Sequence, residues 1–466
     1  MTDTPAPDPR RMHVFDAAAE ALASEVVAYA LDRLRMDPPL DAPRTLEELR
    51  TAVGATVTPA GIGGHEAMRL WAEVLGPACI SQDHRRALSF VPCAPTDAAQ
   101  IFDLVVGASA IYGGSWLEGS GAIVAENQAL RWVADLAGLP PGAGGCFVAG
   151  GTAGNLSALV AARHTAASRR SAEGRDRPAR WIVAASAEVH SSVASAAAVM
   201  DIGVLDVATD AAGRMHGAAV RAAIEGAAPE VRDGLFAVVA TGGTTNAGIV
   251  DDLTGAADAC ADHGLWLHVD GAYGGAAMAA PTARPLFDGV ERADSLVVDP
   301  HKWLFAPFDA AALLYREPAL ARAAHTQHAA YLDVINDSGE WNPSDYAHHL
   351  SRRARGLPFW FSLATYGTDA YATAIEQTLH TTREAARRIE AAPHTELLQE
   401  PVLSVILFRR HGWGPRDYSA WSDAMLADGT SLTVPTSWHG ETVMRFCLVN
   451  PTTTVDDLQE LLDSMA

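Results

Sequence analysis

The chain contains a single lysine, Lys302, among 34 lysine and arginine residues. An arginine side chain stays protonated, whereas a lysine amine can lose its proton and attack a carbonyl group. Lys302 stands in the segment Asp299-Pro300-His301-Lys302-Trp303, directly after the apolar run Leu296-Val297-Val298. We therefore expect a Schiff-base lysine at the end of a strand. A surface lysine left over from a drift toward arginine is the alternative interpretation.

A second apolar run ends in the segment Leu267-His268-Val269-Asp270-Gly271-Ala272-Tyr273-Gly274. A carboxylate after a strand could hydrogen-bond a protonated pyridine nitrogen, and the small residues that follow leave room for a flat ring. Together with the lysine, Asp270 predicts pyridoxal phosphate, whose ring the carboxylate would keep electron-withdrawing. Without the lysine, Asp270 would be interpreted as a helix cap.

Three further segments place polar groups where strands are expected to end. Gly150-Gly151-Thr152-Ala153-Gly154-Asn155 stands between a strand and a helix, where small residues and free N–H groups suit an anion. It is a candidate phosphate site together with His301, with an ordinary tight turn as the alternative. His190 could lie flat on the cofactor ring and Thr244 could bond its exocyclic oxygen. A structural role is the alternative for the histidine.

These residues require a scaffold that brings strand ends together. From about residue 86 to 365, short apolar runs alternate with helical patterns, which predicts an α/β fold with a mostly parallel, buried sheet. Ligands bind beyond the carboxyl ends of the strands in such a sheet. The expected strands are Cys146–Ala149, Trp181–Ala184, Gly203–Val207, Leu235–Thr241, Leu265–Val269 and Ser295–Val298, and the expected helices are Ala153–Arg169, Ala218–Glu225 and Leu253–His263.

The two ends of the chain differ from this central part. Residues 1–85 predict a helical segment, with one helix over Phe15–Leu34 that ends before Pro38-Pro39. Residues 366–466 predict a small C-terminal α/β domain. Its expected elements are helix Thr368–Ala391, strands Val402–Phe408 and Thr442–Leu448, and helix Thr454–Met465.

Charge and composition exclude several classes of protein. The net charge of −22 without a basic run argues against partners such as nucleic acid or anionic membranes. No apolar stretch reaches the roughly 18 residues that a membrane span needs. The N-terminal residues lack an apolar signal core, so we expect a cytoplasmic protein. The five cysteines are scattered, and His263 and His268 lack partners at ligand spacing, so we expect no metal site.

At these motifs the chain resembles the group II pyridoxal-phosphate decarboxylases, the family of aromatic L-amino acid decarboxylase. His268–Tyr273 resembles the family's HVDAAY, and Asp299–Trp303 resembles its [ND]PHKW. Gly150–Leu156 resembles the phosphate turn, with Gly154 where the family usually has alanine. Arg352–Leu357, before Trp360, resembles RRFRSLKxW. The resemblance implies pyridoxal-phosphate fold type I, which is aspartate aminotransferase-like. It also implies a homodimer with the active site at the subunit interface and residues 1–85 wrapping the partner.

The resemblance also implies roles for individual residues. Lys302 would bind the cofactor covalently, Asp270 would pair with the pyridine nitrogen, and His190 would stack on the ring. The other expected cofactor contacts are Thr244 near the ring, Ala272 on its other face, Gly151, Thr152 and His301 at the phosphate, and Ser351 of the partner subunit. The expected substrate pocket comprises Phe90, Val91, Pro92, Cys93, Tyr112, Gly114, Trp116 and Trp303.

The reaction type expected from the resemblance is decarboxylation. Tyr331, in Ala330-Tyr331-Leu332-Asp333, stands where the family's catalytic loop carries the tyrosine that protonates the substrate carbon. Aldehyde-forming relatives often carry phenylalanine there or asparagine at the histidine, whereas this chain keeps Tyr331 and His190. An ordinary packed loop tyrosine is the alternative.

The resemblance implies an aromatic or other bulky L-amino acid as substrate. Val91 and Gly114 are smaller than their counterparts in aromatic-specific relatives, which suggests a roomier pocket, for an indole or another large side chain, and weakens the case for an aromatic substrate. Glutamate and 2,4-diaminobutyrate use the same scaffold and remain alternatives. So do an aldehyde synthase, an aminotransferase with Arg445 as a carboxylate clamp, and a non-enzymatic cofactor-binding regulator. A structural Arg445 is preferred, since a decarboxylase gains nothing by stabilising the group that it expels.

Overall fold

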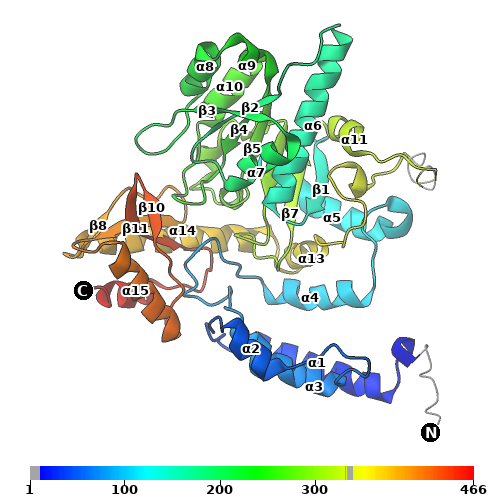
Figure 1. Ribbon diagram of the computed structural model, residues 1–466, viewed down its shortest axis with the longest axis vertical. Helices are drawn as coiled ribbons and strands as arrows, with labels where there is room; N and C mark the ends of the chain where they lie inside the picture. The colour runs from blue at the N-terminus through cyan, green and yellow to red at the C-terminus, as the bar shows by residue number, and fades with distance from the viewer. Residues whose placement is uncertain (1–10, 331, 333–338) are drawn as a thin grey trace.

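The computed structural model describes residues 11–330, 332 and 339–466 of the chain. Figure 1 shows a layer of N-terminal helices at one end and a large sheet flanked by helices at the other. A smaller C-terminal sheet lies beside a long helix. The division into domains near residues 85 and 365 stays a prediction. Within the described part of the chain, no helix is long and apolar enough to cross a lipid bilayer.

The large sheet has seven strands in the order β1-β7-β6-β5-β4-β2-β3. Its strands are β1 (Gly144–Val148), β2 (Ile182–Ser186), β3 (Gly203–Val207), β4 (Leu235–Thr241), β5 (Trp266–Asp270), β6 (Ser295–Val298) and β7 (Ala311–Tyr315). The neighbours β3, β2, β4, β5 and β6 run parallel, which confirms the mostly parallel α/β fold. The sequence prediction missed β7, which is antiparallel to both β1 and β6.

Both faces of this sheet are buried. Alternate residues of the strands belong to two separate hydrophobic cores: Val238 and Leu296 lie in one, and Val239 and Val297 lie in the other. This is why the strands have continuous apolar sequences rather than an apolar–polar alternation. The helices of this region include α5 (Trp116–Leu136), α6 (Gly151–Ala172), α7 (Ser191–Met200), α8 (Gly217–Gly226), α9 (Pro229–Gly234), α10 (Leu253–His263) and α11 (Pro318–His325).

The smaller sheet has the order β10-β11-β9-β8 and is antiparallel throughout. Its strands are β8 (Thr395–Leu397), β9 (Val405–Arg410), β10 (Thr436–Trp438) and β11 (Glu441–Cys447). It packs with α14 (Thr368–Ala391), α15 (Pro415–Ala427) and α16 (Val455–Asp463) around a core that includes Phe408 and Phe446. The predicted helix over Thr368–Ala391 is therefore confirmed, and the two predicted strands are present with shifted ends.

The remaining helices of the described residues precede the first strand in the chain or lie between the last strand of the large sheet and the first strand of the small one. They are α1 (Ala17–Arg35), α2 (Leu46–Val53), α3 (Gly64–Leu70), α4 (Asp97–Ala108) and α13 (Leu357–Tyr366). Short 3-10 or π turns are η1 (Arg11–His13), η2 (Trp71–Leu75), η3 (Gly76–Ala78), η4 (Gly274–Ala279), η5 (Arg284–Phe287), η6 (Val290–Arg292) and η7 (Pro343–Asp345).

A fully buried ion pair joins α5 to the segment before α13. Arg352 donates to both carboxylate oxygens of Glu126 over 2.7 and 2.8 Å, and only 0% and 3% of the two side chains are exposed. Glu126 also accepts the backbone N–H of Gly356, and Arg352 donates to the carbonyl oxygen of Gly113. The Glu126 carboxylate and its partner Arg352 therefore join α5 to the backbone at Gly356 and at Gly113.

We expect Glu126→Gln to destabilise the fold, because the buried guanidinium of Arg352 loses its counter-charge. Breaking a buried pair from one side costs about 3–5 kcal/mol. The matched control is Asp135→Asn, since the pair of Asp135 with Arg131 is partly exposed and worth about 0.3–0.5 kcal/mol. Urea unfolding followed by circular dichroism measures both. Equal unfolding midpoints for Glu126→Gln and the unmodified protein would contradict this role.

Candidate active site

The predicted cofactor residues converge on one cavity of about 230 Å³. It lies beyond the carboxyl ends of β4, β5 and β6 and against the start of α6. Seven residues expected from the sequence line it: Gly151, Thr152, His190, Asp270, Ala272, His301 and Lys302. Residues that the sequence did not single out also line it, among them Thr241, Gly243, Thr245, Asp299, Phe308 and Asp309.

Lys302 follows β6 and reaches the cavity with 20% of its side chain exposed. Its Nζ lies 3.0 Å from Oδ2 of Asp299. Burial lowers the pKa of Lys302, but the carboxylates of Asp299 and Asp270 outweigh this and raise the pKa above its usual value. The amine of Lys302 is therefore protonated, as an ammonium ion, near neutral pH.

Asp270 ends β5 and is held by two hydrogen bonds. Its Oδ2 accepts the side-chain amide of Asn155 over 2.8 Å, and its Oδ1 accepts the backbone N–H of Ala272 over 3.1 Å. The carboxyl group is 4% exposed and lines the cavity. These contacts fix the direction in which the carboxylate faces.

A chain of buried hydrogen bonds in turn fixes Asn155. Its Oδ1 lies 2.9 Å from Nε2 of His268, and Nδ1 of His268 lies 2.8 Å from the hydroxyl of Ser295. That hydroxyl accepts the indole N–H of Trp266. Burial lowers the pKa of His268 to about 4, so the ring is neutral. Because the Asn155 amide donates its protons to Asp270 and Ser192, its Oδ1 accepts from Nε2 of His268, and Nδ1 accepts from the Ser295 hydroxyl. His268 thus orients the side chain of Asn155.

His190 caps the N-terminus of α7. Its Nδ1 accepts the backbone N–H of Ser192 over 3.2 Å and lies 2.9 Å from the Ser192 hydroxyl. The same hydroxyl accepts a hydrogen bond from Asn155. His190 and Asp270 are thus positioned by one shared amide, and the His190 ring stands in the wall of the cavity.

The opposite end of the cavity is built from backbone. Gly150 has a φ of 145°, a conformation that L side chains rarely adopt, and α6 begins at Gly151. A Cβ atom at Gly151 would lie 3.0 Å from that of Ala272 and 3.1 Å from Oδ2 of Asp299, so a side chain there would require these neighbours to move by a few tenths of an ångström. A helix N-terminus with this open approach suits a phosphate group.

The residues present therefore fit pyridoxal phosphate. An amine, a fixed carboxylate, a histidine ring and an anion-binding helix end face one cavity. Its volume is below the roughly 300–1,000 Å³ of drug-sized ligand sites, as suits a single-ring ligand.

Other predicted site residues lie elsewhere in the described structure. Thr244 does not line the cavity, because its hydroxyl accepts the backbone N–H of Ile249 inside a turn. Trp303 is fully buried, stacks on Tyr273 with ring centres 5.4 Å apart, and donates to Thr378. Ser351 is exposed. Tyr331 lies outside the described residues, so its role stays a prediction.

The expected substrate-pocket residues do not line this cavity either. They are Phe90, Val91, Pro92, Cys93, Tyr112, Gly114 and Trp116. Phe90 is 64% exposed and has a φ of 56°. A Cβ atom at Gly114 would lie 2.5 Å from the hydroxyl oxygen of Tyr112. The small size of Gly114 therefore makes room for Tyr112 and does not by itself enlarge a pocket.

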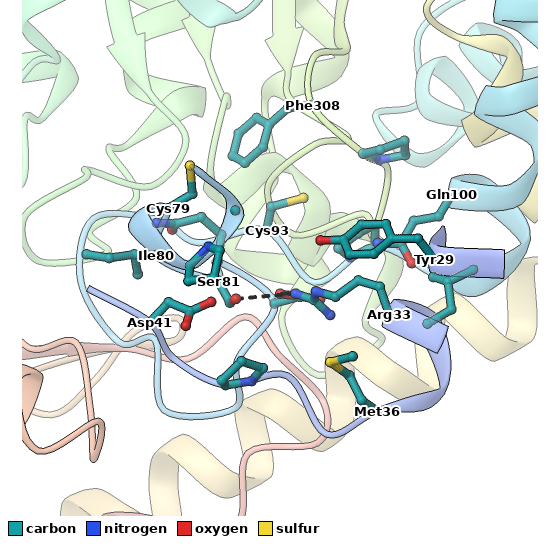
Figure 2. Close-up of a pocket in the computed structure, with 18 of the residues that line it drawn as sticks. Tyr29, Arg33, Met36, Asp41, Cys79, Ile80, Ser81, Cys93, Gln100 and Phe308 are labelled. Atoms are coloured by element: carbon teal, nitrogen blue, oxygen red, sulfur yellow. Dashed lines mark hydrogen bonds and ion pairs between the residues drawn. The ribbon is translucent and has the colours of Figure 1, made fainter. Parts of the chain in front are cut away.

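A second cavity, of about 560 Å³, lies between the N-terminal helices and the body of the protein. Figure 2 shows Tyr29 and Arg33 of α1 on one side of it, with Ser81 and Cys79 across from them. Arg33 forms an ion pair with Asp83 over 2.8 Å. The thiol of Cys93 donates to Ala306, and burial raises its pKa well above the usual range, so it is a poor nucleophile. This second cavity therefore lacks the lysine amine and the fixed carboxylate that line the first, Lys302 and Asp270.

Comparisons with known proteins agree on one family. A family model described as the pyridoxal-dependent decarboxylase conserved domain matches residues 72–411. The aromatic-L-amino-acid decarboxylase of Bacillus atrophaeus is 28% identical over 395 residues, which cover 82% of this chain and 80% of that protein. The L-2,4-diaminobutyrate decarboxylase of Rhizobium meliloti (strain 1021) is 31% identical over 395 residues, covering 82% and 77%. The crystal structure of Oryza sativa TDC with PLP and tryptamine matches with a TM-score of 0.87 at 22% identity, over 99% and 98% of the two chains.

We expect Asn155→Ala to weaken the binding of pyridoxal phosphate, because Asp270 and His190 both lose the amide that positions them. A hydrogen bond to a charged group is worth about 1.5–3 kcal/mol, so the dissociation constant rises about 10-fold or more. A spectroscopic titration of the cofactor-free protein measures this constant. Asn246→Ala is the control, since the Asn246 amide likewise both donates and accepts, to Ser437 and from Thr436, but outside the cavity. Equal constants for both variants would refute the positioning role of Asn155.

Proposed function

The chain belongs to the pyridoxal-dependent decarboxylase family, and from this premise we propose that it removes carbon dioxide from an aromatic or other bulky L-amino acid to leave the corresponding amine. The protein is a carboxy-lyase that uses pyridoxal phosphate. The observation that carries the assignment of roles is the convergence of Lys302, Asp270 and His190 on one cavity at the strand ends. The identity of the substrate and the roles of the individual residues are what we propose.

Lys302 is proposed as the covalent attachment point, since it is the only lysine and its Nζ lies in the cavity. Gly151, Thr152 and His301 would hold the phosphate group at the start of α6, with Ser351 of the partner subunit contributing. Thr244 would act near the ring through the turn that contains Thr245, because its own hydroxyl is already bonded. Ala272 would pack against one face of the ring.

When bound, pyridoxal phosphate supplies a ring that accepts the electron pair left on Cα as carbon dioxide departs. Asp270 would hold a proton on the ring nitrogen, because its carboxylate is fixed and faces the cavity. His190 would keep the ring in one plane from its place at the N-terminus of α7. Tyr331 would deliver a proton to Cα and exclude water when its loop closes.

The hydrogen bonds of Arg445 support decarboxylation rather than transamination as the reaction. Its guanidinium is buried and donates to the backbone carbonyl oxygens of Asn246 and Thr245 over 3.1 and 2.6 Å. An aminotransferase needs an arginine whose donors are open to a substrate carboxylate. Arg445 instead ties β11 to the turn after β4, which supports a structural role.

The substrate class has two candidates. An aromatic or bulky side chain follows from the resemblance to aromatic L-amino acid decarboxylases. The small sizes of Val91 and Gly114 add no support. A diamino acid is the second candidate, because the diaminobutyrate decarboxylase of Rhizobium meliloti is as similar to this chain as the aromatic enzyme of Bacillus atrophaeus.

Release of products from each of the twenty amino acids and from 2,4-diaminobutyrate, with a 2-oxo acid present as amino acceptor, tests the proposed function. We expect carbon dioxide and amine in equal amounts from an aromatic substrate, with neither ammonia nor hydrogen peroxide. Ammonia with peroxide would indicate an aldehyde synthase, and a new keto acid without carbon dioxide would indicate an aminotransferase. Turnover of 2,4-diaminobutyrate or glutamate alone would overturn the aromatic assignment. A Lys302→Ala variant controls for contaminating activity.

We also propose that the protein acts as a homodimer. Helix α1 has no buried residue, and its side chains Leu22, Val26, Val27 and Leu31 are between 36% and 39% exposed. Phe90 and Phe308 are 64% and 55% exposed. A monomer rarely leaves so many large apolar groups in water. The cytoplasmic location stays a prediction.

Sedimentation equilibrium checks the subunit number. We expect a mass twice the 49.0 kDa of one chain at micromolar concentration. Replacing Leu22 and Val26 together by glutamate places charge on the exposed face of α1, so we expect this variant to dissociate more readily. A monomeric mass for the unmodified protein would refute the dimer and with it a site shared between subunits.

A further inference from the structure

We propose that Asp299 controls how readily the cofactor is loaded, because its carboxylate contacts the backbone donor at the start of α6 and the amine of Lys302 at the same time. Both contacts must be released when a phosphate group and an aldehyde enter the cavity. This inference rests on the proposed function of Lys302 and the Gly150–Gly151 turn. It adds a negatively charged side chain that competes with the ligand.

The contacts of Asp299 support the first part. Asp299 follows β6 directly and is 1% exposed. Its Oδ2 accepts the backbone N–H of Gly151 over 3.2 Å and lies 3.0 Å from Nζ of Lys302. The Nε2 atom of His301 is 3.7 Å from the same oxygen. One oxygen atom therefore stands at the meeting point of three groups proposed for cofactor binding.

The second oxygen of Asp299 is unusual. Oδ1 is buried and has no hydrogen-bond partner among the described residues, although Asp299 lines the cavity. A buried carboxylate oxygen without a partner is costly, and such atoms are rare in folded proteins. The carboxylate of Asp299 is therefore incompletely hydrogen-bonded, so a rearrangement on loading breaks no hydrogen bond at Oδ1.

The carboxylate opposes a phosphate group in two ways. The start of α6 offers its N–H groups to an anion, yet that of Gly151 is already given to Asp299. A phosphate placed there would meet a second negative charge in a water-poor cavity, where repulsion is strong. A neutral amide of the same shape would bring no charge and would offer a donor.

The ion pair with Lys302 opposes the covalent step. An ammonium ion has no free electron pair, so Nζ must lose a proton before it forms a C–N bond to an aldehyde carbon, with the aldehyde oxygen and both remaining amine hydrogens leaving as water. The charged groups that act on Nζ are the carboxylates of Asp299 and Asp270. Burial lowers the pKa of His301 and raises the pKa of the Cys447 thiol, so these two neighbours of Lys302 are neutral near neutral pH. Asp299 is in direct contact with Nζ and so contributes most to keeping the proton in place.

The test compares loading of cofactor-free protein in two isosteric variants. In Asp299→Asn the competing charge is removed, and we expect the rate at which visible absorption appears on adding pyridoxal phosphate to rise about tenfold or more, the size of one charge-assisted hydrogen bond in a buried site. Asp258→Asn is the control. Asp258 forms a partly exposed ion pair with Arg292 and does not line the cavity. Its loading rate should stay within about twofold of the unmodified protein, as for a partly exposed ion pair.

Inorganic phosphate provides a second measurement that does not involve Lys302. We expect it to slow loading at lower concentration in Asp299→Asn than in the unmodified protein, because the donor of Gly151 is open. Loading of Asp299→Asn at or below the unmodified rate, with no gain in phosphate competition, overturns the inference. If the unmodified protein never gains visible absorption and borohydride leaves Lys302 unchanged, the proposed function itself fails, so the two failures are distinguishable.

Discussion

Both faces of the central sheet are packed against helices, and this constraint confines polar chemistry to the ends of the strands. Strands β2, β4, β5, β6 and β7 are buried at every position. A charged side chain within such a strand would have neither water nor a partner. Asp270 is tolerated because it is the last residue of β5, and Lys302 because it follows β6 by four positions. The cavity is the place where the fold allows charge.

A polar site in such surroundings needs internal partners, and the chain supplies them in series. The indole of Trp266 bonds Ser295, which bonds His268, which bonds Asn155, which bonds Asp270. Each link leaves its neighbour one favourable orientation, because donor and acceptor cannot exchange along the series. This series of hydrogen bonds begins at Trp266, the first residue of β5, and orients the carboxylate of Asp270, the last residue of the same strand.

Much of this architecture could be predicted from the sequence, and the omissions have physical reasons. Strands β3, β4 and β6 and helices α10 and α14 have the predicted bounds, because apolar runs and helical spacing are local signals. Strand β7 was missed: Ala311–Tyr315 is short, begins with alanines, and pairs antiparallel with the preceding strand β6 and with β1, which is distant in sequence. The turn geometry of Thr244 and the buried stacking of Trp303 likewise depend on partners that no local pattern reveals.

The site shows the same division. The resemblance identified Lys302, Asp270 and His190 as residues of one place, and they line one cavity. Asn155 was recognised only as part of a glycine-rich turn, since its partner His268 is 113 residues away. Asp299 was quoted only as a motif residue, and its contact with Gly151 joins positions 148 residues apart. The motifs in the sequence therefore predict which residues line the cavity, but they do not predict which hydrogen bonds orient those residues.

The single lysine has a practical consequence for following this protein in solution. Because Nζ of Lys302 belongs to the only lysine side chain and 20% of that side chain is exposed, an acylating or aldehyde label has two amine targets, this one and the α-amino group. The mass added to a peptide containing residue 302 therefore reports the fraction of empty sites in a sample, without background from other side-chain amines. Mass spectrometry of the labelled protein thus becomes an occupancy assay that needs no substrate.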